Sequence, residues 1–216
     1  LKADYQFSAD ELLSATDENS KIIWLCSPNN PTGNALNPIE VEKVLQNFQG
    51  IVVLDEAYID FSSQPSYLQK LKDYPNMVVL QTFSKAWGSA GVRLGMAFAS
   101  PEIISIFNKV KYPYNVNILT QRYAIKLLDN FASVEKKVKE ILKNREKLIK
   151  SLSKVQCITE IYPTDANFVL VKTTDADAIY NYLINKGIVA RNRNGITLCD
   201  NCIRITVGTA VENKQV

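Results

Sequence analysis

The chain has 216 residues, of which 46% are hydrophobic and 22% charged, and its formal net charge is +3. Such a chain can bury a sizeable core, and so small and evenly spread a charge gives no argument for nucleic-acid binding. No apolar run approaches the roughly 18 residues of a membrane span, and no charged start followed by an apolar core marks a signal peptide. We therefore expect a cytoplasmic protein with neither a membrane nor a nucleic acid as its partner.

The residue types that are missing or scarce exclude several kinds of chemistry. The sequence contains no histidine, which excludes Ser-His and Cys-His nucleophile pairs and histidine metal sites within this chain. A zinc site at Cys199 and Cys202 would need two further ligands, and only the widely separated Cys26 and Cys157 remain. The Cys199 and Cys202 pair also lacks the strand-then-helix context of a thioredoxin-like redox site. We expect no metal and interpret the cysteines as reduced thiols.

Apolar runs alternate with polar turns through the first half of the chain. The expected elements are a short helix over 10–13 opened by Ser8, strands at 22–26, 51–54, 77–80 and 96–99, and a helix from Pro38 to about Phe48. Asn37, Pro38 and Glu40 have the spacing of a helix start with a capping box. Runs that are apolar on both faces are typical of strands in a helix-covered, largely parallel sheet. The pattern therefore predicts an α/β architecture.

The second half of the chain has a different pattern. From about 118 to 155 the apolar residues follow the 3.6-residue period of an amphipathic helix. Beyond it we expect a strand at 168–171, a helix from Asp175 to about Lys186, a short strand near Ile188 and a last strand at 203–207. These elements make a compact α+β unit. We place the domain boundary within the long helix, which gives domains of 1–125 and 126–216.

Polar side chains follow three of the expected strands. Asn30, then Asp55 with Tyr58, and then Lys85 each lie just beyond the carboxyl end of a strand, where open α/β sheets bind ligands. Singly, an asparagine before Pro-Thr-Gly is a turn residue and Asp55 could cap a helix. Together they supply parts that a pyridoxal phosphate site needs, since it requires a lysine for a Schiff base, a carboxylate for the pyridine nitrogen and donors for the phenolic oxygen.

Four ordered motifs carry a family resemblance. They are Ser-Pro-Asn-Asn-Pro-Thr-Gly at 27–33, Asp-Glu-Ala-Tyr at 55–58, Phe-Ser-Lys at 83–85 with Arg93 eight residues later, and Ile-Arg-Ile-Thr-Val-Gly-Thr at 203–209. The set resembles the fold-type I pyridoxal-phosphate aminotransferases, and in detail it is most similar to their histidinol-phosphate branch. The resemblance implies the mostly parallel central sheet of the large domain of that family, in part, followed by a smaller α+β C-terminal domain.

The resemblance also implies a role for each site residue. Lys85 would form the Schiff base with pyridoxal 5'-phosphate and move the substrate's α-proton, and Asp55 would pair with the pyridine nitrogen. The remaining roles are Asn30 and Tyr58 at the phenolic oxygen, Ser84 and Arg93 at the cofactor phosphate, Arg204 at the substrate carboxylate, and Arg191 near the substrate end with the substrate phosphate as one candidate ligand.

The implied reaction is transamination between L-histidinol phosphate and 2-oxoglutarate, giving imidazole-acetol phosphate and L-glutamate in histidine biosynthesis, by a homodimer. Two alternatives stay open. One is a sister pyridoxal-phosphate enzyme, either an aromatic or other amino-acid aminotransferase or a threonine-phosphate decarboxylase. The other is an inactive fragment that keeps the fold and binds only a ligand or a partner. In this family a region that would lie upstream of Leu1 supplies part of the phosphate site, and we expect this N-terminal part of the large domain to be absent from this sequence.

Overall fold

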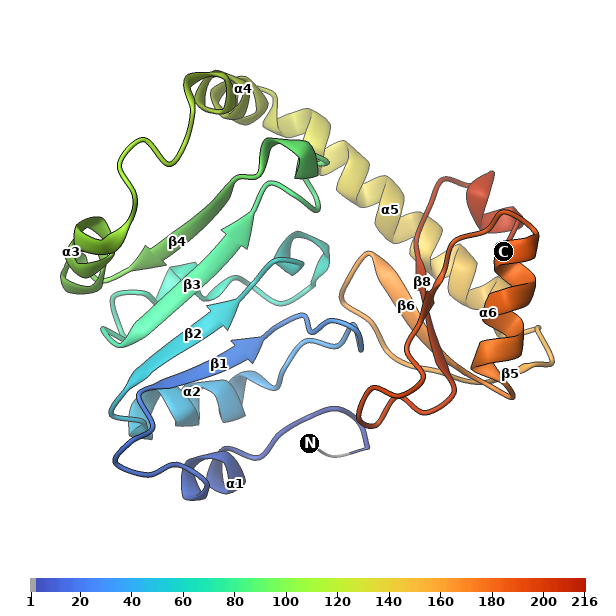
Figure 1. Ribbon diagram of the computed structural model, residues 1–216, viewed down its shortest axis with the longest axis horizontal. Coiled ribbons are helices and arrows are strands. Elements are labelled where there is room, and N and C mark those ends of the chain that lie inside the picture. The colour runs from blue at the N-terminus through green and yellow to red at the C-terminus, as the bar shows by residue number, and fades with distance from the viewer. Residues whose placement is uncertain (1–2) are drawn as a thin grey trace.

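Residues 3–216 are described by the computed structural model and form two sheets of four strands each (Figure 1). The first sheet has the order β1-β2-β3-β4 and the second β5-β6-β8-β7. The strands of the first sheet are β1 (Ile22–Cys26), β2 (Ile51–Asp55), β3 (Met77–Thr82) and β4 (Gly95–Ala99). Strands β1, β2 and β3 are parallel and β4 runs antiparallel to β3. This arrangement confirms the expected α/β class with a parallel-rich sheet.

Helices cover the two faces of the first sheet unequally. On one face, α1 (Ala9–Ser14) and α2 (Pro38–Asn47) bury the alternate side chains of β1, β2 and β3 in one core. On the other face, α3 (Pro101–Val110) covers Val53 and Val78. The expectation that every strand is buried on both faces is wrong for β1, where Ile22 and Trp24 are 56% and 58% exposed. Since the cluster around α3 contains residues of β2, β3 and β4 and none of β1, β1 is buried on one side.

The start of α2 differs from a capping box. Asn37 caps the helix as expected, because its Oδ1 accepts the backbone N–H of Ile39 at 3.0 Å. The Glu40 carboxylate does not return to the cap. It accepts instead the N–H of Ala9 at 2.6 Å, at the first residue of α1. Glu40 thereby satisfies an otherwise unpaired donor at the α1 terminus and joins the two helices.

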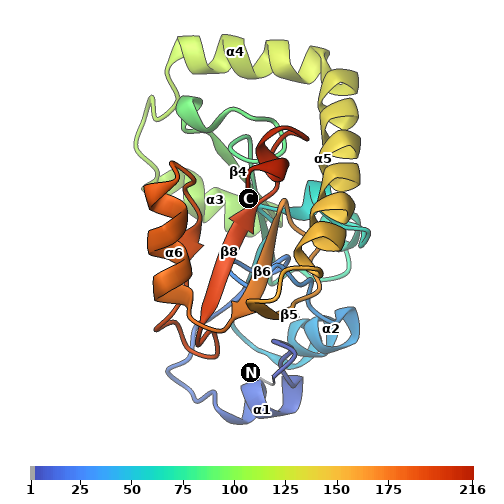
Figure 2. The same cartoon turned by 90° about the vertical axis from the view of Figure 1, so that its right-hand side faces the viewer.

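The helical region expected at 118–155 is two helices. α4 (Ile118–Asp129) and α5 (Phe131–Leu152) meet at Asn130, whose backbone is not helical (φ −110°, ψ 34°). The two helices run in clearly different directions (Figure 2). α5 then leads from the first sheet to the second, beside which its C-terminal half packs (Figure 1). Among the described residues no helix is long and apolar enough to cross a membrane.

The second sheet is antiparallel throughout. Its strands are β5 (Ile158–Ile161), β6 (Phe168–Thr173), β7 (Arg191–Asn192) and β8 (Cys202–Thr206). α5 and α6 (Ala176–Asn185) bury the apolar face of this sheet. The strand expected near Ile188 is wrong in position, because the Ile188 N–H bonds to the Leu183 carbonyl at the end of α6 and the strand begins only at Arg191. Short 3₁₀ turns complete the elements, at Ile59–Phe61, Tyr67–Lys70, Ala90–Val92 and Glu212–Lys214.

A separate apolar cluster joins the two sheets. It contains Tyr58, Phe61 and Ala86 from the first part of the chain with Ala166 and Phe168 from the second, and α5 packs against it. Arg145 of α5 donates to the carbonyl of Ala166 at 2.9 Å. This cluster therefore fixes the carboxyl edge of the first sheet against the second sheet.

Candidate active site

Asp55 is the last residue of β2, in the middle of the first sheet. Its Cα partners are Cys26 on β1 and Leu80 on β3. The Asp55 carbonyl accepts the N–H of Ser27 at 3.0 Å, and its Oδ1 accepts the N–H of Ala57 at the same distance. Burial, reinforced by the negative charge of Asp55, raises the pKa of the Cys26 thiol. The carboxylate therefore lies at the sheet edge close to the end of β1.

Lys85 lies on the loop that follows β3. Three backbone hydrogen bonds close this loop, from Phe83 N–H to the Leu94 carbonyl, from Ser89 N–H to the Phe83 carbonyl and from Gly88 N–H to the Lys85 carbonyl. The Lys85 Nζ is 5.1 Å from the centroid of the Tyr58 ring. The side chain is exposed, and it forms no ion pair with any carboxylate in residues 3–216. Lys85 is thus an accessible amine placed over a phenol ring.

The Tyr58 ring lies between the Lys85 amine and the second sheet. Its ring is buried and meets Phe168 edge-on, with centroids 5.2 Å apart and an interplanar angle of 89°. The Arg204 Cζ lies 4.7 Å from the Phe168 centroid, a stacked geometry that favours a guanidinium. Arg204 Nη1 donates to Asn30 Oδ1 at 2.6 Å. Burial lowers the pKa of Arg204, and the nearby Tyr58 works in the opposite direction.

Residues from the second half of the chain contact the turn that carries Asn30 and form hydrogen bonds with it. Gly33 has φ +86°, and a Cβ there would lie 2.5 Å from Thr164 Oγ1. Asp165 N–H donates to the Gly33 carbonyl at 2.7 Å, and the Asp165 carboxylate accepts the N–H of Ala35 at 3.1 Å. Sequence reasoning did not identify Thr164 or Asp165 as support for the site. The one available signal was Gly33, since a glycine in that turn indicates close backbone approach.

Ser84 and Arg93 lie on the same loop as Lys85. The Ser84 N–H donates to Thr82 Oγ1 at 3.0 Å. Arg93 is exposed, has φ +54°, and donates from Nη1 to the Ala90 carbonyl at 3.1 Å. Within residues 3–216 no hydrogen bond joins the Arg93 guanidinium to Ser84 or Lys85. These two residues are therefore near the lysine in the chain, and their proposed role at a phosphate stays a prediction.

Arg191 belongs to the second sheet. It is on β7 as the Cα partner of Arg204 on β8, and its side chain is exposed. Cross-strand partners in an antiparallel pair place their side chains on the same face. The structure thus brings together Lys85 with Tyr58, and Arg204 with Asn30 and Arg191.

The donor set matches the functional groups of pyridoxal phosphate. An amine at Lys85, a carboxylate at Asp55, a phenol and an amide at Tyr58 and Asn30, and guanidinium groups suit an aldehyde, a ring nitrogen, a phenolic oxygen and anionic groups. Arg204 Nε is shielded from solvent and has no hydrogen-bond partner in the described part of the chain. A buried cationic donor without a partner is favourable only when an anion reaches it.

Nearly the whole chain matches one known protein family. The family model for class I and II aminotransferases matches residues 2–216. The chain belongs to this family. Its curated relatives include histidinol-phosphate aminotransferases of Bacteroides thetaiotaomicron, 57% identical over 213 residues, and of Flavobacterium johnsoniae, 51% identical over 216 residues. These alignments cover 99% and 100% of this chain, and the chain spans 62% of the length of each relative.

Solved structures show the same aminotransferase fold. Histidinol-phosphate aminotransferase from Clostridium acetobutylicum superposes with a TM-score of 0.92 at 24% identity, covering 100% of this chain and 67% of that one. The enzyme from Sinorhizobium meliloti, solved with pyridoxal-5'-phosphate, has a TM-score of 0.85 at 26% identity and coverages of 96% and 58%. Threonine-phosphate decarboxylase from Porphyromonas gingivalis scores 0.82 at 24% identity, with coverages of 97% and 66%.

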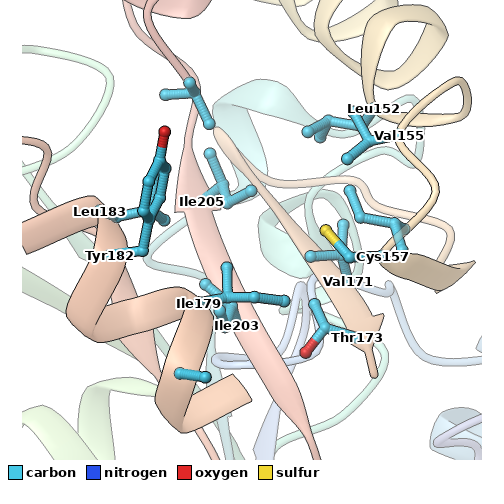
Figure 3. Close-up of a pocket in the computed structure, with 13 residues that line it drawn as sticks. Leu152, Val155, Cys157, Val171, Thr173, Ile179, Tyr182, Leu183, Ile203 and Ile205 are labelled. Atoms are coloured by element: carbon cyan, nitrogen blue, oxygen red, sulfur yellow. The ribbon is translucent and has the colours of Figure 1, made fainter. Parts of the chain in front are cut away.

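This aminotransferase chain has a separate cavity on the face of the second sheet that α5 and α6 cover. A cavity of about 330 Å³ is enclosed by α6, the end of α5 and the sheet, and Val171, Ile203 and Ile205 point into it (Figure 3). Ile203 and Ile205 alternate along β8 with Arg204, so this cavity and Arg204 lie on opposite faces. Its lining is mostly aliphatic, with Cys157, Thr173 and Tyr182 besides, and none of the lining side chains is a carboxylate, an amine or a guanidinium. The candidate active site is therefore the polar edge described above.

Proposed function

We propose that the protein uses pyridoxal phosphate to transfer an amino group between L-histidinol phosphate and 2-oxoglutarate, as a cytoplasmic homodimer. The observation that carries the proposal is the placement of the Lys85 amine over Tyr58 while Arg204 reaches Asn30 across the two sheets. Relatives named histidinol-phosphate aminotransferase, 50–57% identical over almost the whole chain, support this substrate. The likeness to threonine-phosphate decarboxylase is at 24% identity and supports only the fold.

The cofactor, when bound, supplies an electron sink that makes the α C–H bond of the substrate acidic. Asp55, at the end of β2, would keep the ring nitrogen protonated through its negative charge. Lys85 would hold the cofactor covalently between turnovers. Once the substrate amine has freed Lys85, its Nζ would take the proton from the α-carbon and deliver it where the new C–H bond forms.

The arginines would bind and orient the reactants. Arg204 has a stacked guanidinium fixed by Phe168, so its fork would engage the phosphate of the donor and the carboxylate of the acceptor. Asn30 orients that guanidinium through their hydrogen bond. Ser84 and Arg93, on the lysine loop, would bind the cofactor phosphate.

An exposed apolar surface supports the homodimer. Tyr112 and Tyr114 are 84% and 98% exposed, and Ile118 and Leu119 at the start of α4 are 56% and 73% exposed. Large contiguous apolar patches are typical of interaction sites. We expect light scattering to give the mass of a dimer and Leu119→Glu to shift it to a monomer. A Leu119→Glu dimer of unchanged affinity would place the interface elsewhere.

Steady-state kinetics test the reaction. Because one group on the protein would carry the amine between the two substrates, initial rates at several fixed concentrations of 2-oxoglutarate should give parallel double-reciprocal lines. L-histidinol phosphate alone should release a keto product in an amount equal to the protein. Intersecting lines, or preference for an aromatic amino acid or threonine phosphate as donor, would contradict the proposal.

A further inference from the structure

Three arginines share one face of the second sheet. Arg191 is the Cα partner of Arg204, and Asn192 is the partner of Ile203. The ladder continues because the Arg193 N–H donates to the Cys202 carbonyl at 2.8 Å. Side chains alternate along a strand, so Arg191 and Arg193 lie on the Arg204 face. Asn192 points the other way and donates to Asp177 of α6 at 2.6 Å.

No carboxylate among the described residues pairs with these cations. Arg193 Nε and Arg204 Nε are both shielded from solvent and lack a hydrogen-bond partner among residues 3–216. No ion pair in that part of the chain involves Arg191, Arg193 or Arg204. After burial and the opposing effect of Tyr58, the positive charges of Arg193 and Arg191 further lower the pKa of Arg204, which indicates that both lie near the Arg204 guanidinium. Like charges gathered without a counter-charge attract an anion to the site.

Building on the proposed function, we propose that Arg193 is a third cation of the substrate-anion site and sets its preference for a phosphate monoester over a carboxylate. A phosphate monoester carries about 1.5 to 2 negative charges at pH 7 and three strong acceptor oxygens. A carboxylate carries one charge and two oxygens, which a single guanidinium fork satisfies. Arg193 therefore strengthens binding of the phosphate substrate and adds little to binding of 2-oxoglutarate.

Calorimetric titration of the cofactor-loaded protein at its natural length tests this assignment. Loading places the cofactor's own phosphate on its site, so added inorganic phosphate reports on the substrate-anion site. Arg193→Gln should weaken phosphate binding about tenfold and 2-oxoglutarate binding by less than about threefold, since a hydrogen-bonded charge is lost only for phosphate. Lys154→Gln, which removes an exposed charge from the same part of the protein, should leave both affinities unchanged.

An equal loss of both affinities, or no loss, overturns the proposal. If Arg193→Gln fails to fold, Arg193→Met, which removes the same charge and keeps an apolar stem, decides. A fall in the ratio of phosphate affinity to 2-oxoglutarate affinity supports the proposal, and an unchanged ratio overturns it. If Arg193→Gln turns over L-histidinol phosphate at the wild-type rate, the proposed role of Arg193 is rejected and the proposed reaction is unaffected. If phosphate binding depends on Arg193 but the wild type does not turn over L-histidinol phosphate, the proposed reaction is rejected. The assignment of Arg193 to an anion site then still holds.

Discussion

Arg204 and Asn30 are 174 positions apart in the chain, yet Arg204 Nη1 donates to Asn30 Oδ1 at 2.6 Å. Asn30 follows β1 of the first sheet and Arg204 is on β8 of the second. The bond therefore joins the two parts of the protein at the candidate site. The stack of Arg204 on Phe168, which itself contacts Tyr58, extends the connection to the ring beneath Lys85.

Arg204→Lys tests the substrate side of this connection. Lysine keeps the charge and loses both the planar fork and the stack on Phe168. We expect KM for both substrates to rise about tenfold to hundredfold, with little change in cofactor uptake. Arg122→Lys on the exposed side of α4 is the matched control and should behave as the wild type. Unchanged KM values in Arg204→Lys would remove Arg204 from the substrate site.

Asp55→Ala separates chemistry from folding. We expect transamination to fall by several orders of magnitude while the melting temperature changes little, because Asp55 is half-buried at a strand end. Asp129→Ala, at the exposed end of α4, should keep full activity. Near-normal turnover in Asp55→Ala would refute its role at the ring nitrogen.

Cys26 provides a second readout of Asp55 that does not depend on activity. The negative charge of Asp55 adds to burial in raising the pKa of the Cys26 thiol. Removing that charge should lower the thiol pKa, so that alkylation of Cys26 becomes faster at a given pH. The pH profile of the alkylation rate, followed by mass spectrometry, should therefore move to lower pH in Asp55→Ala. A profile that stays in place would mean that the carboxylate is not beside Cys26.

Gly33→Ala tests how the Asn30 turn is held. The new Cβ would lie 2.5 Å from Thr164 Oγ1, and the backbone has φ +86°. We expect a loss of about 1–3 kcal/mol in the free energy of unfolding, measured in urea. Gly91→Ala is the control, because a Cβ there meets no atom within 4 Å. Equal stabilities of the two variants would contradict the close approach of Thr164 to the turn.

Glu56, next to Asp55, gives a prediction for stability against pH. Its buried carboxylate accepts the Tyr67 N–H at 2.7 Å and the Gln81 Nε2 at 2.9 Å, and burial raises its pKa. Because the folded-state pKa is above the unfolded value, the folded protein binds more protons, and this contribution to stability is lost as pH rises. The unfolding free energy of the wild type minus that of Glu56→Gln should therefore fall above pH 4.5. A difference that rises with pH would show the pKa shift to be in the opposite direction.

Most elements could be predicted because their patterns are local. The four strands of the first sheet are short apolar runs between turn residues, and their ends placed Asn30, Asp55, Tyr58 and Lys85 at one edge. α3 was missed although Ser100, Pro101 and Glu102 are a helix start, with Ser100 accepting the N–H of Ile103. β5 was missed because it is short and mostly not buried, so it has no continuous apolar run.

The remaining features of the site depend on contacts between distant segments. The bond from Arg204 to Asn30 joins residues 174 positions apart, and the bond from Ala35 to Asp165 joins residues 130 positions apart. The stack of Arg204 on Phe168 joins two different strands of the second sheet. No spacing or periodicity within one segment encodes such a contact. Resemblance to a family could assign a role to Arg204, whereas its partners required the structure.

Covalent trapping of the cofactor tests the central claim most directly. The protein is incubated with pyridoxal phosphate, reduced with borohydride, digested and mapped by mass spectrometry, beside Lys85→Ala and, as control, Lys109→Ala. We predict one reduced adduct, on Lys85, in the wild type and in Lys109→Ala, and none in Lys85→Ala. An adduct on another lysine of the wild type, or no adduct at all, would contradict the assignment of Lys85 as the residue that holds the cofactor.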